Sequence, residues 1–452
     1  MIKKEIQHIL RLSTPLIIAN VFQLGMGFVD TIMAGRISAL DLAAVAMGSS
    51  LWVLVFLFML GVFIAVSPII AHHVGANKPE RVAPVFQHAL WFALLSSIPS
   101  IIAVRYVSGI MPWLSIDAAA IDITSKYLAA YSWGMPGVAL FLALRFTNEG
   151  LGITRPIMVC QIIGFLLNIV GNYIFMFGHL GMPAMGAPGA GVSSAIVVWI
   201  NAILLLGYVA RSQRYRVYEL FSRFSSPRPE LIREIVAIGF PIAMMLLMEV
   251  GMFSTISLLM GKLGVVSAAA HQVAINFASL TFMVPLGFGR AATIRVGNAM
   301  GAGDMIKARR SGYTAITMSL AVMIVFAALL ISFPEQIVSI YSSDEHVAAV
   351  AIQLIIIAGL FQVFDGIQVA ANGSLQGMKD TAIPAIITFI AYWVVGIPSG
   401  YYFGISHGMG AKGLWWGCIL GLGVAAVLLL ARFVVLTRSS RHRFLIGQET
   451  RS

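Results

Sequence analysis

The sequence predicts an all-α polytopic membrane protein, with twelve transmembrane helices in two six-helix bundles related by a pseudo-twofold axis along the membrane normal. Composition, apolar segment length and an internal repeat predict this fold. Of the 452 residues, 59% are hydrophobic and only 10% are charged, whereas soluble proteins carry about 25% charged residues. Apolar segments of about 20 residues, long enough to cross a bilayer, recur throughout the chain.

We divide the chain into twelve spans from these apolar segments. Their predicted ranges are 12–34, 45–71, 86–110, 125–147, 156–178, 190–210, 235–261, 268–294, 311–333, 347–372, 382–404 and 412–436. Several exceed 20 residues, so tilted or kinked helices are expected. Proline removes a backbone hydrogen bond and therefore bends or ends a helix. Six prolines are expected to do so here, namely Pro15, Pro68, Pro136, Pro241, Pro285 and Pro384.

The basic residues separate into the two sides of the membrane. Of the 29 Lys and Arg residues, all but five fall at the termini or in alternate loops on one side; the exceptions are Arg36, Arg105, Lys126, Lys262 and Lys412. The positive-inside rule assigns the basic side to the cytoplasm, so both termini are expected there. The net charge of +11 then reflects topology, and no nucleic-acid partner is expected. No signal-peptide cleavage site is evident, so we expect the first span to be retained.

The two halves of the chain repeat one another. Pro15 aligns with Pro241 and Gly61 with Gly287 at a constant offset of 226 residues, and "GAPG" at 186–189 aligns with "GAKG" at 410–413. Each half has six spans, an even number, so both begin on the same side of the membrane. This is a parallel repeat, an arrangement that suits alternating access to a site between the halves.

The repeat also predicts the domain organisation. Residues 1–210 form an N-terminal six-helix lobe, 211–234 a basic cytoplasmic linker, and 235–452 a C-terminal six-helix lobe with a basic tail.

Three carboxylates lie inside the predicted spans, away from their ends: Asp30, Glu249 and Asp365. A charge at the bilayer centre costs about 2.5–3.5 kcal/mol on insertion scales. No buried Lys or Arg is expected beside these acids. We therefore expect them to be functional, the alternative being purely structural hydrogen bonding.

Polar residues accompany the acids at helical spacing, which places them on common helix faces. The faces are Asn20–Gln23–Gly27–Asp30, Gln161–Asn168–Asn172, Gln272–Asn276–Ser279–Met283, Phe361–Asp365–Gln368–Asn372 and Met245–Met248–Glu249–Met252. Such faces need a wet cavity or a partner helix, because lipid offers no hydrogen bonds. We interpret them as one acidic pocket in each half, which could hold a hard cation or take up a proton. For the amides, ordinary interhelical hydrogen bonding is an equal alternative.

Several motifs in both halves resemble the NorM-type branch of the multidrug and toxic compound extrusion (MATE) family. They are "FVDTIMAGRIS" (28–38), "MEVGMFS" (248–254), "AAAHQVAINFAS" (268–279), "VPLGFGRAATIRVGNAMGAGD" (284–304) and "FDGIQVAANGSLQGMKDTAIP" (364–384). The resemblance implies a twelve-helix, two-lobed antiporter of the bacterial inner membrane, for which a monomer would suffice. Such a protein exports cationic amphipathic drugs and dyes in exchange for Na⁺ or H⁺, uses no other cofactor, and is not an enzyme.

The resemblance also implies roles for individual residues. Glu249 and Asp365 match the C-terminal-lobe cation-binding acids, with Na⁺ or H⁺ as their ligand. Asp30 matches the N-terminal-lobe acid, where Asn168, Asn172 and Ser194 would complete an oxygen cage. The expected substrate-cavity residues are Gln23, Met248, Met252, Gln272, Asn276, Phe361 and Gln368. Phe361 stands where some relatives carry a tyrosine, and it offers a ring face but no hydroxyl.

Other function classes stay open as alternatives. A lipid or lipid-linked sugar flippase of similar two-lobed architecture should carry more buried Lys and Arg to hold phosphates. A membrane-embedded enzyme should show a catalytic motif, and the metalloprotease motif HExxH does not occur in the sequence. A channel would not need the twofold repeat with two acidic pockets. The Gly-rich segment 287–303 lacks the Lys-Ser/Thr ending of a phosphate loop, so no ATP site is expected.

Overall fold

The computed structural model describes residues 2–114, 116–222, 225–341 and 344–449, with helices and no strand among them. Two basic residues assigned to the cytoplasmic side, Arg223 and Arg451, lie outside these residues. In the described part, eleven helices are long and apolar enough to cross a membrane, or twelve if one bent pair forms a single span. The predicted all-α membrane fold is confirmed, and the bent pair corresponds to the fourth predicted span, 125–147.

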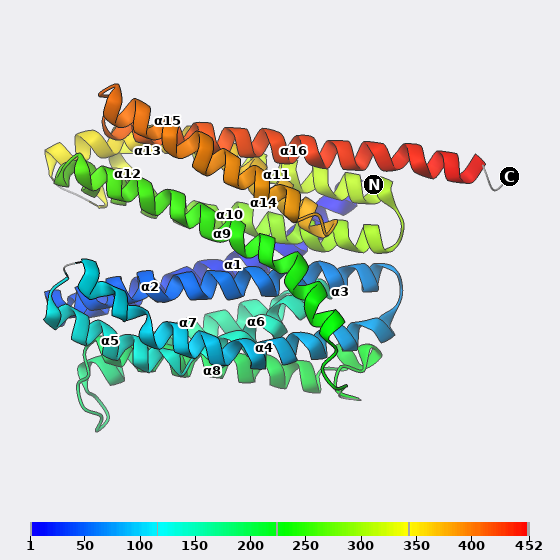
Figure 1. Cartoon of the computed structure of the whole chain (residues 1–452), viewed down its shortest axis with the longest axis horizontal. Coiled ribbons are helices and arrows are strands. Elements are labelled where there is room, and N and C mark those ends of the chain that lie inside the picture. The colour runs from blue at the N-terminus through cyan, green and yellow to red at the C-terminus, as the bar shows by residue number, and fades with distance from the viewer. Residues whose placement is uncertain (1, 115, 223–224, 342–343, 450–452) are drawn as a thin grey trace. The chain divides into compact units, whose positions relative to one another are not determined.

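The first half of the chain contains the helices coloured blue to green in Figure 1. They are α1 (Ile2–Gly35), α2 (Ala39–Ile64), α3 (Val66–Gly75), η1 (Pro79–Arg81), α4 (Val82–Tyr106), η2 (Val107–Leu114), α5 (Ala118–Ser132), α6 (Met135–Gly150), α7 (Arg155–Phe177) and α8 (Ala187–Arg211).

The second half begins with a short 3₁₀ helix and ends with a long helix coloured red in Figure 1. Its elements are η3 (Gln213–Tyr218), α9 (Pro229–Lys262), α10 (Val265–Gly301), α11 (Met305–Ser332), α12 (Pro334–Ser339), α13 (Glu345–Gly377), α14 (Ala382–Phe389), η4 (Ile390–Gly396), α15 (Ile397–Tyr401), η5 (Tyr402–Ser406) and α16 (Ala411–Glu449).

The prolines interrupt some helices and leave others continuous. Pro136 is in the first turn of α6, directly after the 48° bend between α5 and α6. Pro68 follows the break between α2 and α3 at Ala65. Pro15, Pro241 and Pro285 lie inside helices that continue through them. Helices tolerate proline when neighbouring groups satisfy the released carbonyl.

The chain divides into two compact units that split two of its helices. The N-terminal unit is Ile18–Ala243, and the C-terminal unit is Met1–Ile17 together with Met244–Ser452. Compared with the predicted lobes, residues 1–17 fall with the second half and residues 235–243 with the first. The two division points are 226 residues apart, which is the offset of the internal repeat.

Repeated glycines allow close packing at equivalent places. A Cβ on Gly61 would lie 2.2 Å from the Cα of Ala243 in the N-terminal unit, and one on Gly287 would lie 2.3 Å from Cγ1 of Ile17 in the C-terminal unit. Gly186 and Gly410, which precede α8 and α16, have φ of +63° and +60°. This left-handed backbone favours glycine. The sequence repeat is therefore also a repeat of local structure.

The helix of Asp365 and the helices that carry the predicted partners of Asp30 are packed among others. In the C-terminal unit α13 lies against α10, α11 and α16, and in the N-terminal unit α7 lies against α8. Almost every residue of α6 is buried. The buried polar side chains on these helices therefore need hydrogen-bond partners within the protein.

Part of the predicted linker is attached to α4. Gln87 accepts hydrogen bonds from the backbone N–H and the hydroxyl of Ser225, both at 3.0 Å, while Trp91 Nε1 donates to the Ser225 carbonyl at 3.1 Å. His88 Nε2 accepts the Arg228 backbone N–H at 2.8 Å. The segment just before α9 is therefore an integral part of the N-terminal unit.

The Gly61 contact can be tested by adding one methyl group. Gly61→Ala should destabilise the protein by about 1–3 kcal/mol, because backbone atoms of Ala243 block the new Cβ and cannot rotate away. Gly207→Ala in α8 is the matched control, since nothing lies within 4 Å of its Cβ position. That change should leave stability unchanged or raise it by about 0.5–1 kcal/mol. Thermal unfolding in detergent measures both, and equal midpoints would contradict the packing.

Candidate functional site

In the N-terminal unit, Asp30 on α1 is surrounded by the three partners expected from the sequence. Its Oδ1 accepts hydrogen bonds from Nδ2 of Asn168 at 3.0 Å and of Asn172 at 2.6 Å, both on α7. Its Oδ2 accepts one from the hydroxyl of Ser194 on α8 at 3.4 Å. The spacing of the two asparagines, one helical turn apart, directs both amides at the same carboxylate.

All of these partners are neutral donors, and this determines what the site can do. Donors stabilise Asp30 as an anion without cancelling its charge. The amide oxygens of Asn168 and Asn172 are buried and have no hydrogen-bond partner among the described residues. Turning either amide over would present that oxygen to a cation held by Asp30. The site can therefore attract a positive charge and offer it further ligands.

Aromatic side chains that the sequence analysis did not single out lie near Asp30. Tyr127 and Tyr131 on α5 are buried, stack with ring centroids 6.4 Å apart, and lie within electrostatic range of the Asp30 carboxylate. Trp52 packs on Tyr131 with ring centroids 4.5 Å apart. An acid beside aromatic rings is a favourable environment for organic cations.

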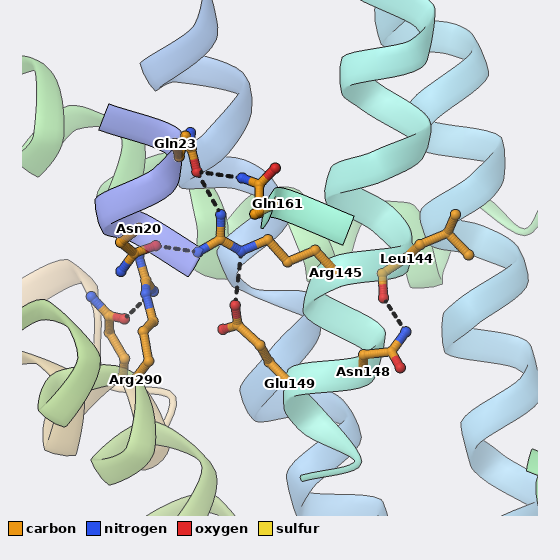
Figure 2. Close-up of polar contacts among 9 residues, drawn as sticks. Asn20, Gln23, Leu144, Arg145, Asn148, Glu149, Gln161 and Arg290 are labelled. Carbon is orange, nitrogen blue, oxygen red and sulfur yellow. Dashed lines mark hydrogen bonds and ion pairs between the residues drawn. The ribbon is translucent and has the colours of Figure 1, made fainter. Parts of the chain in front are cut away.

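A second polar network in this unit is centred on Arg145 of α6, which is only 4% exposed (Figure 2). Its Nε donates to Glu149 Oε1 at 3.0 Å, its Nη1 to Gln23 Oε1 at 3.0 Å, and its Nη2 to Asn20 Oδ1 at 2.7 Å. All three nitrogens of the guanidinium are thus engaged by acceptors of the same unit.

This network continues from α1 into α7 and α8. Gln161 Nε2 also donates to Gln23 Oε1 at 3.1 Å, and Asn201 Nδ2 donates to Gln161 Oε1 at 3.2 Å. These three helices therefore carry Asp30 with its partners and, together with α6, the Arg145 network. Gln23, which we expected in the substrate cavity, is a shared acceptor in this network.

Buried charge is not confined to the three carboxylates that the sequence analysis singled out. Arg145 and Glu149 are buried as an ion pair, and Glu5 is buried against Arg295 in the C-terminal unit, 2.7 Å from its Nη2. Burial is tolerated because each charge has an opposite partner, and Arg145 and Glu5 have further hydrogen bonds to neutral side chains. The signal for the first pair was present in the sequence, since residues 145 and 149 are one helical turn apart.

In the C-terminal unit, Asp365 on α13 is 2% exposed and lies within electrostatic range of Glu249 on α9. Phe361, one turn before Asp365, packs edge-on against Phe253 and Trp415, with ring centroids 6.0 and 5.9 Å away. The two predicted acids are thus brought together from distant parts of the sequence, beside an aromatic cluster.

The other expected cavity residues of this unit are spread between its interior and its surface. Met252 is fully buried in the apolar core, whereas Met248 is half-buried. Gln272 is exposed, and its Nε2 donates to Asn276 Oδ1 at 3.0 Å. Gln368 is 3% exposed, and its amide oxygen has no partner within the described residues.

No three His, Cys, Asp or Glu side chains of the described residues gather as they would around a transition metal. An ion bound beside Asp30, or beside Glu249 and Asp365, would instead combine carboxylates with neutral oxygens. Such oxygen ligands suit hard cations and protons rather than soft metals.

The MatE family model matches residues 15–174 and 241–402, which places one copy in each half of the chain. This chain belongs to the MATE family. It is 42% identical over 442 residues to the multidrug resistance protein NorM of Vibrio vulnificus strain YJ016, covering 97% of each chain. It is 40% identical over 443 residues to the NorM of Vibrio cholerae, again over 97% of each. The resemblance seen in the sequence motifs is confirmed, and the relatives are named for drug resistance rather than for an enzymatic reaction.

Solved structures of this family share the fold. A eukaryotic MATE transporter, AtDTX14, superimposes with a TM-score of 0.86 at 23% identity, covering 98% of this chain and 99% of that one. A MATE structure in complex with MaD3S gives a TM-score of 0.89 at 20% identity, covering 97% of each chain. The two-lobed helical architecture is therefore that of MATE transporters.

The Arg145 network predicts a specific pattern of stability. Arg145→Met should destabilise the protein by about 3–5 kcal/mol, because Glu149 would remain as an unpaired buried charge. Combining Arg145→Met with Glu149→Leu should restore much of that loss, since both charges are removed. Thermal unfolding of the purified variants measures this. A double variant no more stable than the single one would show that the pair is not the source of the effect.

Proposed function

We propose that this membrane protein is a secondary active exporter of cationic amphipathic drugs and dyes, which exchanges them for Na⁺ or H⁺ by alternating access. The observation that carries the proposal is a buried acidic site in each unit. Among the described residues, Asp30 has only neutral hydrogen-bond partners, and Asp365 has a second acid, Glu249, as its charged neighbour. The drug-resistance names of relatives at about 40% identity support the same conclusion.

The exchange of drug for ion follows from the free-energy cost of leaving these carboxylates charged and unneutralised. An unneutralised carboxylate within a membrane is unfavourable by several kcal/mol, so each site favours an occupant with a positive charge. A drug cation and a coupling ion that neutralise the same acid compete for it. If each prefers a different orientation of the transporter, uptake of the ion drives release of the drug.

The surroundings of the acids favour large organic cations as substrates. Tyr127 and Tyr131 are near Asp30, while Phe361 and Trp415 belong to the aromatic cluster beside Asp365. Aromatic faces attract desolvated cations and also accommodate apolar drug surfaces. Adaptable methionines such as Met248 would widen the range of shapes that bind.

The main alternative is a flippase for lipids or lipid-linked sugars. It would need cationic side chains available to phosphate, yet Arg145 is engaged by Glu149, Gln23 and Asn20. Fold alone does not decide between the two functions. A structure with a TM-score of 0.87 and 20% identity, from Pyrococcus furiosus, is described as having a binding pocket of reversed polarity that suggests a different function. The excess of buried acid in this chain favours cation export.

The remaining features of the proposal concern setting and assembly. We propose that the protein resides in a bacterial inner membrane with both termini in the cytoplasm, because the basic residues collect on that side. Small organic cations and membrane lipid would be its partners, and the two units would act as its lobes. A monomer contains both acidic sites and therefore suffices.

Neutralising the C-terminal acid tests the proposal most directly. Asp365→Asn should reduce drug efflux from cells to background, because an uncharged amide cannot bind and release a cation as a carboxylate does. The variant protein should still reach the membrane. Asp122→Asn is the matched control, since Asp122 is 61% exposed and paired with Lys126. Efflux of a cationic dye measures the difference. Efflux by Asp365→Asn equal to that of the control would remove Asp365 from the mechanism.

Inverted membrane vesicles identify the coupling ion. An imposed Na⁺ gradient or an imposed pH gradient should each be tested for its ability to drive dye uptake into the vesicles. The proposal expects at least one gradient to drive transport and Asp30→Asn to weaken it. Uptake that requires ATP and ignores both gradients would contradict secondary active transport.

A further inference from the structure

Two layers of polar side chains lie on the same three helices of the N-terminal unit. The Asp30 layer consists of Asp30, Asn168, Asn172 and Ser194, and the Arg145 layer consists of Asn20, Gln23, Arg145, Glu149, Gln161 and Asn201. On each of α1, α7 and α8, a residue of one layer is seven residues from a residue of the other, the pairs being Gln23 and Asp30, Gln161 and Asn168, and Ser194 and Asn201. Seven residues make about two helical turns, or about 10 Å, so both members of a pair share one helix face. A rotation of any of these helices therefore changes both layers together.

Glycines fix the spacing of α7 and α8 at both layers. A Cβ on Gly164 would lie 2.4 Å from Nδ2 of Asn201, and one on Gly171 would lie 2.3 Å from Oγ of Ser193. These two helices therefore form a close pair that carries all three donors to Asp30. The position of the carboxylate against its donors then depends on how α1 is set against this pair.

The attachment of α1 begins as soon as it enters the N-terminal unit. The unit starts at Ile18, three residues after Pro15, which weakens the helix by removing a backbone hydrogen bond. The next polar residues of α1 are Asn20 and Gln23, and Arg145 of α6 holds both (Figure 2). Its Nη2 donates to Asn20 Oδ1 at 2.7 Å, and its Nη1 donates to Gln23 Oε1 at 3.0 Å.

Arginine suits this attachment because its donors have fixed directions. The guanidinium is planar, and its N–H groups form a rigid fork. With Nε held by Glu149 Oε1 at 3.0 Å, the directions of the other two nitrogens are determined as well. They engage two acceptors that are three residues apart on α1, Asn20 and Gln23. Two such contacts fix the rotation of α1 as well as its height, which a single contact would not do.

We propose that Arg145 is a positioning residue for the Asp30 site. By holding Asn20 and Gln23 it sets the rotation of α1, and this rotation aims Asp30 at the amides of α7. Gln161 of α7 donates to the same Gln23 oxygen at 3.1 Å and so ties the two helices together at this point. The proposal rests on the proposed function in taking Asp30 as a cation-binding acid, on which Arg145 acts through α1.

Labelling of Asp30 by dicyclohexylcarbodiimide, an apolar reagent for buried carboxyl groups, tests the positioning directly. Both oxygens of Asp30 accept hydrogen bonds, so an acid displaced from its donors should react faster. Arg145→Met combined with Glu149→Leu removes the guanidinium without leaving an unpaired charge. Asn20→Leu removes one acceptor on α1 and leaves the ion pair of α6 in place. Each variant should raise the labelling rate about fivefold, as expected for the loss of about one hydrogen bond. Mass spectrometry of the Asp30 peptide measures the rate.

Thr147→Val is the matched control for these variants. Thr147 is fully buried on α6, two residues from Arg145, and its hydroxyl donates to the Ala143 carbonyl of its own helix at 2.8 Å. Valine has nearly the same shape, so Asp30 should be labelled as in the unmodified protein. Thermal unfolding identifies any misfolded variant. A folded double variant that labels Asp30 at the unmodified rate would overturn the proposal, and if the double variant does not fold, an unchanged rate in Asn20→Leu would do so.

Equilibrium binding of a cationic dye shows whether this positioning serves the transporter. Asn20→Leu should weaken dye affinity about fivefold when Asp30 is present. The same change should have no effect on affinity in an Asp30→Asn background, because its effect passes through Asp30. A merely structural role would lower the number of binding sites in both backgrounds at unchanged affinity, and this result would contradict the proposal. If the unmodified protein bound no dye, the proposed function would fail, yet the labelling of Asp30 would still decide whether Arg145 positions it.

Discussion

The negative charge of a carboxylate inside a membrane is unfavourable unless neighbouring groups stabilise it. The buried acids of this protein have two physically different kinds of neighbour. Glu149 has a permanent partner in Arg145, whose remaining donors are engaged by Asn20 and Gln23. The charges of Arg145 and Glu149 cancel, so this network leaves no net charge for a ligand. Asp30 has only neutral donors, and Asp365 faces a second acid. Only sites of this second kind retain a charge that a bound cation would neutralise.

Much of this could be predicted because lipid restricts what the chain can do. Apolar length determines the spans, and helical spacing places Asn168 and Asn172 on one face, where the structure finds them bound to Asp30. Tertiary packing was harder to predict from the sequence. Two of the acceptors that make the burial of Arg145 possible, Asn20 and Gln23, come from another helix. Tyr392 points inward within a π-helical turn, which a period of 3.6 residues does not predict. Such features depend on partners that only the fold brings together.

The division into units was also difficult to predict, since domain boundaries are normally sought in loops. Here they fall inside α1 and α9, at positions that the internal repeat makes equivalent. Gly61 and Gly287 explain the arrangement locally, because each lets a helix pack closely on the residue that ends its segment, Ala243 or Ile17. A pattern of matched glycines was visible in the sequence, but its meaning depended on the contacts they make.

These boundaries constrain how such a transporter can change its conformation. The chain passes between the units only after Ile17 and after Ala243, in both cases within a continuous helix. Pro15 and Pro241 precede these points by two residues, and each removes one backbone hydrogen bond from its helix. A helix bends most easily where such a bond is absent. Any movement of one unit against the other must bend the chain at these two places. The repeat therefore supplies a matched pair of weakened helical turns. One is in α1, which carries Asp30, and the other is in α9, which carries Glu249.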